Sequence, residues 1–116
     1  MYLASVIVDV SARALDRAFY YRVPDELASV QVGCAVSVDF GNRPVVAYVV
    51  GLHELSEDDI VADGGNPAKI KPLAGVLSTP YFDARAVELI RWISREYLCP
   101  LTSALHLFTP PGGAPK

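Results

Sequence analysis

Three adjacent aromatic residues between two arginines have the clearest potential for chemistry in this sequence. Phe19, Tyr20 and Tyr21 follow Arg17 and precede Arg22. Aromatic faces stack on nucleic-acid bases and guanidinium groups neutralise phosphates, so the segment predicts contact with a nucleic-acid strand. The alternative is that the rings fill a small core. Because strand side chains alternate, Phe19 and Tyr21 would then face one way and Tyr20 the other.

Two further positions can complete a pocket around these rings. Gly41 lies in an expected hairpin turn, where the missing Cβ lets a ligand approach the backbone closely. Lys71 supplies an ammonium group just after an acidic segment. If the rings, the turn and the ammonium meet at one rim of a small barrel, they form a pocket for one nucleotide. The candidate phosphate contacts are the neighbouring basic residues Arg17, Arg22, Arg43 and Lys69.

Motifs typical of enzymes and metal centres are missing from this sequence. His53 and His106 are isolated, and the acidic pair at 58–59 lies in a polar stretch. Gly64 and Gly65 are not followed by the Gly-Lys-Ser/Thr of a phosphate loop. We therefore expect no catalytic residue, no metal and no cofactor in this chain.

The cysteines and the hydropathy indicate a reducing, cytoplasmic setting. Cys34 and Cys99 are far apart and belong to no Cys-x-x-Cys pair, which argues against a disulfide framework or a zinc site. No apolar run approaches the roughly 20 residues that a membrane helix needs. The sequence predicts no membrane partner.

The charge is unevenly distributed along the chain. The net charge is −3, whereas domains that bind nucleic acid through a broad surface are usually basic. Residues 51–68 carry five acids and no Lys or Arg, and the remainder of the chain has a net charge of +2. Any contact with phosphate should therefore be local.

Hydrophobic patterns indicate the elements that position these residues. Alternation predicts strands over 3–10 and 34–40. Further strands are expected over 19–23, over 45–52, which is apolar on both faces and therefore central in the sheet, and over 69–77 at a sheet edge. Residues 41–42 predict a hairpin turn, 24–27 a helical turn, and 53–68 an exposed loop. The predicted fold class is α+β: a curled sheet or partly open barrel over 3–77, followed by two helices over 83–108.

The first of these helices has a clear beginning. Asp83 is a good N-cap, and Phe82 and Val87 occupy the positions of a hydrophobic staple. The expected buried stripe is Ala86, Leu89, Ile90, Ile93 and Tyr97. Pro100 ends this helix, residues 101–108 form the second, and residues 111–116 are a Pro- and Gly-rich linker after a domain over 1–110.

Five segments in order resemble one known domain. Residues 6–10, 15–24, 32–43, 69–73 and 89–97 are similar to segments of the N-terminal 3′ DNA-binding domain of PriA-type replication-restart helicases. The resemblance covers about residues 3–110. It implies a small β-rich module with trailing helices that is not itself the motor. Such a module captures the 3′ end of a nascent leading strand at a stalled bacterial replication fork, with little base preference.

The same resemblance implies roles for individual residues. Phe19 would lie beside the terminal base, and Tyr21 would be the second aromatic residue of the pocket. Gly41 would let the ligand approach the backbone closely, and Lys71 would be the lysine of the pocket. Expected partners are DNA and the other domains of such a helicase, together with single-stranded DNA-binding protein and primosome proteins.

One residue departs from the family pattern. The family usually has Phe-Asp-Tyr where this sequence has Phe19-Tyr20-Tyr21. A carboxylate accepts hydrogen bonds more strongly than a phenol, so end recognition is expected to be organised differently here. The alternative function is a protein–protein or interdomain docking module that has lost 3′-end recognition.

Overall fold

We describe the chain from a computed structural model that places residues 1–9, 18–62 and 64–109. Its strands are β1 (Tyr2–Val8), β2 (Ala18–Arg22), β3 (Ala35–Phe40), β4 (Arg43–Glu54) and β5 (Gly75–Val76). Its α-helices are α1 (Glu57–Ala62), α2 (Ala84–Tyr97) and α3 (Leu101–Leu105), and short 3-10 turns cover Asp25–Leu27, Pro67–Lys69 and His106–Phe108.

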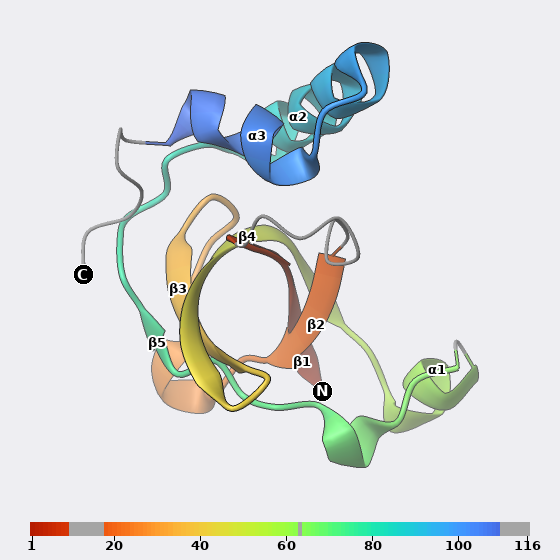
Figure 1. Ribbon diagram of the computed structural model, residues 1–116. Coiled ribbons are helices and arrows are strands. Elements are labelled where there is room, and N and C mark those ends of the chain that lie inside the picture. Colours follow the sequence, from red (N-terminus) through yellow and green to blue (C-terminus); the bar gives the residue numbers. More distant parts are fainter. Residues whose placement is uncertain (10–17, 63, 110–116) are drawn as a thin grey trace.

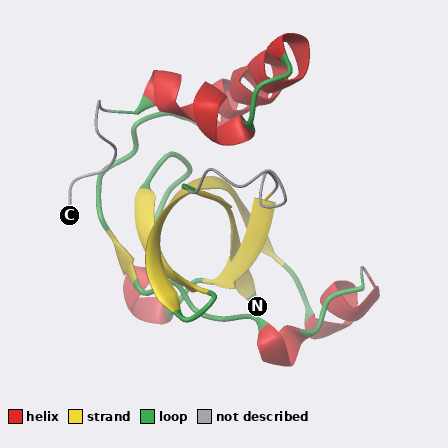
Figure 2. Cartoon of the chain, in the orientation of Figure 1, coloured by secondary structure: helices red, strands yellow, loops and turns green. Residues whose placement is uncertain are grey.

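The strands form one antiparallel sheet in the order β2-β1-β4-β3-β5. The sheet curls strongly on itself (Figure 1). The curl brings β2 and β3 into contact, since Tyr21 of β2 reaches Asp39 of β3 and the ring of Phe19 meets that of Phe40. β4 is central, between β1 and β3, which confirms the position expected from its apolar character on both faces. The predicted α+β class, a curled sheet followed by helices, is confirmed (Figure 2).

Two apolar clusters lie on opposite faces of the sheet. The inner cluster fills the curl and consists of alternate strand residues, among them Val6, Val36 and Val49, all fully buried. The outer cluster joins the intervening residues, such as Ile7 and Tyr48, to the C-terminal helices. The alternation of β1 and β3 thus sends successive side chains to two different cores.

A short extended segment spans the open side of the curled sheet. The N–H of Arg22 donates to the carbonyl of Lys71 (2.8 Å), and the N–H of Leu73 donates to the carbonyl of Arg22 (2.9 Å). On the other side, the N–H of Ala74 donates to the carbonyl of Ser37 in β3 (2.8 Å). We call this junction between the outer edges of β2 and β3, bridged by residues 71–74, the seam.

The helices α2 and α3 lie together against the outer face of the sheet, whereas α1 lies apart from them (Figure 1). The side chain of Asp83 accepts a hydrogen bond from the N–H of Ala86 (3.0 Å), and Phe82 and Val87 are both buried in the outer cluster. The predicted N-cap is therefore confirmed, and both residues of the expected staple lie in one cluster.

The stripe predicted for this helix is partly wrong. Ala86, Ile90 and Ile93 face the outer cluster, but Leu89 and Tyr97 are exposed. Val87 instead faces inward, and with Phe82 it belongs to the buried residues of the outer cluster.

The loop predicted over 53–68 is also partly wrong, since it contains α1 and a 3-10 turn. Ser56 and Asp59 cap α1 reciprocally: each side chain accepts a hydrogen bond from the other residue's N–H, at 3.1 and 3.2 Å. The hydrogen bond from the Ser56 N–H to the Asp59 carboxylate, and secondarily one from the Ser56 side chain, lower the pKa of Asp59 below its ordinary value. Ile60 is buried and anchors this helix.

The strand predicted over 69–77 is wrong except at β5. Pro72 has no N–H to offer a ladder, and residues 71–74 divide their hydrogen bonds between β2 and β3. β5 does lie at a sheet edge, as expected. The linker predicted at 111–116 lies outside the described residues.

Candidate nucleic-acid interface

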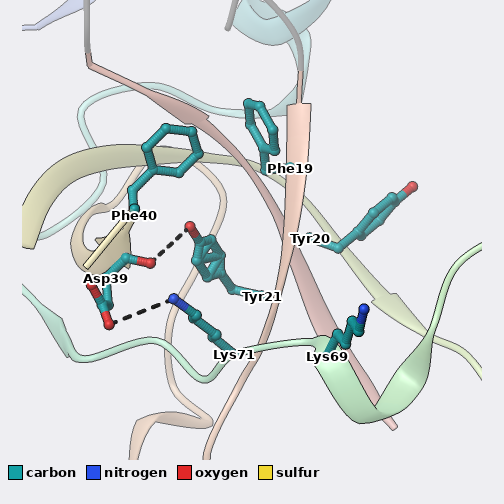
Figure 3. Close-up of a pocket in the computed structure, with 8 residues that line it drawn as sticks. Phe19, Tyr20, Tyr21, Asp39, Phe40, Lys69 and Lys71 are labelled. Atoms are coloured by element: carbon teal, nitrogen blue, oxygen red, sulfur yellow. Dashed lines mark hydrogen bonds and ion pairs between the residues drawn. The ribbon is translucent and has the colours of Figure 1, made fainter. Parts of the chain in front are cut away.

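The structure brings five sequence-predicted residues to one hollow at the seam. Phe19, Tyr20, Tyr21, Gly41 and Lys71 all line it (Figure 3). The other lining residues are Asp39, Phe40 and Lys69. The hollow has a volume of about 230 Å³ and is open to solvent. This is below the roughly 300–1,000 Å³ typical of pockets that enclose whole drug-sized ligands. The hollow can therefore hold at most one nucleotide.

Main-chain polar groups face this hollow from two strands. Alternate residues of an antiparallel pair direct their N–H and C=O groups toward the partner strand or away from it. Arg22 directs both groups away from β1, into the seam, and Tyr20 is two residues earlier on the same strand. By the same alternation, Asp39 on β3 follows Ser37, whose carbonyl also faces the seam. The backbone groups of Tyr20 and Asp39 therefore point toward the hollow, where the Asp39 carbonyl accepts a hydrogen bond from the Tyr21 hydroxyl.

Tyr21 belongs to the inner cluster and reaches from β2 to β3 across the seam. The residue is only 5% exposed, and its hydroxyl donates a hydrogen bond to the main-chain carbonyl of Asp39 (3.3 Å). Burial, and secondarily the negative charge of Asp39, raise the pKa of Tyr21 above its ordinary value of 10.0. The phenol therefore stays protonated at neutral pH and remains a donor.

Phe19 and Phe40 form the apolar part of the hollow. Their rings meet edge to face, with centroids 5.2 Å apart and planes at 75°. Both rings are half-buried and pack against the inner cluster, so each keeps some surface for a ligand. A ring fixed by packing is a good stacking surface because it loses little side-chain freedom when a base binds.

Tyr20 projects from β2 on the side opposite to Tyr21 (Figure 3). Its side chain is 47% exposed, and its ring lies 5.8 Å from that of His53. The ring of His53 in turn lies within hydrogen-bond distance of the Ser5 hydroxyl (3.2 Å). The expected alternation of Phe19, Tyr20 and Tyr21 is present, yet all three residues line the hollow.

The charged groups of the hollow are two lysines and one aspartate. The ammonium of Lys71 lies 3.7 Å from the carboxylate of Asp39, and the two side chains are 48% and 53% exposed (Figure 3). Lys69, also exposed, adds a second positive charge at the rim. The lining therefore carries one net positive charge, although the chain as a whole is acidic.

Gly41 and Asn42 make the hairpin turn between β3 and β4, as predicted, with φ values of 60° and 65°. A Cβ built on Gly41 would have no described atom within 4 Å. The space above this turn is therefore open on the rim of the hollow.

The structure does not bring every candidate phosphate contact to this hollow. Arg22 lines a different cavity beside Tyr2 and Pro72, and Arg43 is an exposed residue at the start of β4 that does not line the hollow. Arg17 lies outside the described residues. Asp39 and Phe40 were not expected here, and their only signal in the sequence was their position directly before Gly41.

Among residues 1–9, 18–62 and 64–109, no three His, Cys, Asp or Glu side chains gather in a way that could hold a metal ion. Within the same residues, none of the helices has the length and hydropathy to cross a membrane.

Comparison with known proteins identifies a matching family. Residues 5–110 match the sequence profile described as the 3′ DNA-binding domain (3′BD) of PriA. The chain is 32% identical over 111 residues to the replication restart protein PriA of Bacillus subtilis, and 30% identical over 109 residues to that of Synechocystis. These matches cover 95% and 94% of this chain, but only 13% and 12% of the relatives' length. The chain therefore belongs to the family of PriA 3′ DNA-binding domains.

Proposed function

We propose that this chain binds the 3′ terminus of a nascent DNA strand at stalled or branched replication forks, as the targeting module of a replication-restart protein. The observation that carries the proposal is the hollow at the seam. It combines aromatic rings, residues of two strands and lysines in a space that suits one nucleotide.

The size and position of the hollow support recognition of a strand end. A nucleotide within a strand continues on both sides, whereas a terminal nucleotide continues on one side only. A hollow of about 230 Å³ between β2 and the end of β3 suits the second case. Stacking on Phe19 and hydrogen bonds to main-chain groups do not depend on which base is present. The proposed recognition therefore has little base preference.

The local charge supports a weak but positioned contact with the backbone of the strand. Lys69 and Lys71 face the hollow, and the acids at 57–59 belong to α1. Two neutralised phosphates would give only a shallow dependence of affinity on salt, about 0.7 logarithmic units per phosphate for single strands. Affinity would then depend mainly on the terminal nucleotide.

The partners and the setting follow from the same proposal. The matched relatives are replication restart proteins, and this chain corresponds to a small part of their length. In this proposal the chain binds DNA and performs no catalysis itself. It works beside the other domains of a PriA-type helicase, single-stranded DNA-binding protein and primosome proteins, at forks in the bacterial cytoplasm.

The test is fluorescence anisotropy with two fork-like duplexes that differ only in polarity at the branch. In one the nascent strand presents a free 3′ end, and in the other a free 5′ end. We expect the 3′-ended fork to bind at least about tenfold more tightly, the equivalent of 1.4 kcal/mol. Lys71→Ala should reduce this preference, whereas Arg85→Ala, on the exposed surface of α2, should not. Equal affinity for the two forks would refute the proposal.

A docking role is the second candidate, and one observation favours it. Trp92, Tyr97 and Leu98 on or next to α2 are exposed, and the rings of Trp92 and Tyr97 lie 6.5 Å apart. Exposed apolar side chains that lie together are typical of protein-contact surfaces. If neither fork polarity is preferred but the chain binds the remaining domains of a PriA-type protein, docking becomes the better assignment.

A further inference from the structure

The hollow contains a carboxylate that the family motif would place elsewhere. Where the family usually has an aspartate between the two aromatic residues, this chain has Tyr20. The Tyr20 side chain points away from Tyr21 (Figure 3). Asp39 is the only acidic residue among those that line the hollow. It enters from β3, on the opposite side of the seam from β2 (Figure 3).

The Asp39 side chain is positioned but remains accessible to a ligand. Asp39 lies opposite Pro44 of β4 in the sheet, and its carbonyl accepts a hydrogen bond from the Tyr21 hydroxyl. The position of its backbone, from which the side chain projects, is therefore fixed. Its carboxylate is 53% exposed and lies 3.7 Å from the Lys71 ammonium, too long for a close charged hydrogen bond. Both groups therefore retain hydrogen-bonding capacity for a ligand.

A 3′-hydroxyl differs from every internal position of a strand because it can donate a hydrogen bond. Among the side chains that line the hollow, Asp39 is the strongest acceptor. A 3′-phosphate would instead bring a charge of about −1.5 to −2 at neutral pH close to this carboxylate. An internal phosphodiester would bring one negative charge to the same place.

We propose, on the basis of the function proposed above, that Asp39 is the residue that selects a free 3′-hydroxyl. The 3′-hydroxyl donates a hydrogen bond to the Asp39 carboxylate, and the same carboxylate repels a phosphate at that position. Asp39 thereby supplies, from β3, a carboxylate that this chain does not have at position 20.

The experiment measures anisotropy with three versions of one labelled oligonucleotide: linear with a 3′-hydroxyl, linear with a 3′-phosphate, and circular. The proteins are the wild-type chain, Asp39→Asn and the matched control Asp58→Asn. The control removes the same charge from an exposed residue of α1 that lines none of the described cavities. Asn keeps the shape of Asp and the main-chain carbonyl that Tyr21 uses, and a melting curve checks that each variant is folded.

We expect the wild type and Asp58→Asn to prefer the 3′-hydroxyl over the 3′-phosphate by about tenfold or more, as for a charge-assisted hydrogen bond. Asp39→Asn should lower this preference to about threefold or less, mainly because it binds the 3′-phosphate strand and the circular strand more tightly than the wild type does. If Asp39→Asn keeps the wild-type ratio, the role of Asp39 is refuted while the proposed function stands. If the wild type binds the circle as well as the 3′-hydroxyl strand, both proposals fail.

A fourth oligonucleotide, with a 3′-deoxy end, separates hydrogen bonding from charge. The wild type should bind it more weakly than the 3′-hydroxyl strand, by severalfold. Asp39→Ala, which has no acceptor, should bind the two alike. Asp39→Asn should keep part of the difference, because its amide oxygen still accepts. A difference that persists in Asp39→Ala would place the acceptor elsewhere.

Discussion

The hydroxyl of Tyr21 donates a hydrogen bond to the main-chain carbonyl of Asp39 and so joins two strands that are not neighbours in the sheet. β2 and β3 lie at separate positions in the order β2-β1-β4-β3-β5, and only the curl of the sheet brings their edges together. This contact places the aromatic segment beside the carboxylate and the turn at Gly41. The candidate site is therefore a property of the curl rather than of any one strand.

Replacement of Phe19 by Ala should weaken binding of the 3′-ended fork by about 1–3 kcal/mol, the usual effect of removing one stacked ring. Tyr97→Ala is the matched control, because it removes an exposed aromatic ring on α2, away from the hollow. Anisotropy titrations measure both affinities, and thermal unfolding checks that the loss of packing on Phe40 has not unfolded the variant. Wild-type affinity in Phe19→Ala would remove this ring from the binding site.

Replacement of Tyr20 by Asp should increase affinity for a 3′-hydroxyl strand severalfold, because it restores the carboxylate of the family pattern next to an exposed strand edge. It should also restore part of the hydroxyl preference in an Asp39→Asn background. Tyr20→Asn is the control, since it shortens the side chain without adding a charge. No change in either background would show that the side chain at position 20 does not touch the terminal nucleotide.

Replacement of Gly41 by Ala tests how closely the ligand approaches the turn. Gly41 has φ 60°, so a side chain there costs about 1–2 kcal/mol of stability through backbone strain. Gly64→Ala is the matched control: Gly64 has φ 88°, and a Cβ there would likewise meet no described atom within 4 Å. The two variants should lose similar stability in urea unfolding, but only Gly41→Ala should lose affinity for the 3′ end. Equal affinities would mean that no ligand atom comes near the turn.

Replacement of Tyr21 by Phe should reduce the free energy of unfolding at pH 7 by about 0.5–1.5 kcal/mol, because the Asp39 carbonyl loses its donor. The folded-state pKa of Tyr21 is raised above 10.0, so folding favours the protonated phenol. The associated stability is present below pH 10 and declines as the pH rises through the folded pKa. Unfolding in urea between pH 7 and 11 should therefore show the wild type losing its advantage over Tyr21→Phe. A constant difference across this range would contradict the assignment.

Replacement of Gly33 by Ala should be far more destabilising than the changes at the hollow. A Cβ at Gly33 would lie 1.9 Å from the backbone oxygen of Phe82, at a φ of 96°. Either the sheet or the start of α2 must move, and we expect a loss of more than about 3 kcal/mol. Gly75→Ala, with no positive φ and no described atom within 4 Å of its Cβ, should cost less than about 1 kcal/mol. Chemical denaturation measures both, and similar losses would refute this account.

Much of the fold followed from local patterns in the sequence. Alternation located the strands of the sheet, the Gly41–Asn42 pair marked the turn, and Asp83 marked the start of α2. The predictions failed at residues 69–74, in part of the loop expected over 53–68, and at Leu89 and Tyr97 of α2. The hydrogen bonds of residues 71–74 go to two strands far away in the chain, and the buried face of α2 is set by its packing on the outer cluster, so local patterns could not predict either.

The candidate site was predictable only in part for the same reason. The aromatic residues, Gly41 and Lys71 could be named from their chemistry and from the family resemblance. Asp39 had no such signal, because an isolated acid in an alternating strand is ordinarily a solvated side chain. The role proposed for Asp39 rests on its position beside Lys71 and Tyr21, a relationship that depends on the curl of the sheet. Arg22 and Arg43 were plausible from sequence proximity alone, but they do not line the hollow.

The seam has a consequence for the stability of the protein. Its three contributing stretches are remote from one another along the chain, so a denatured molecule has no ready-made receptor for a DNA terminus. A bound DNA terminus would therefore stabilise the folded form by mass action. The free energy of unfolding would rise by about 2.7 kcal/mol when free DNA is at one hundred times Kd. Under the proposed function, a domain with DNA bound would therefore unfold at a higher temperature than the same domain without DNA.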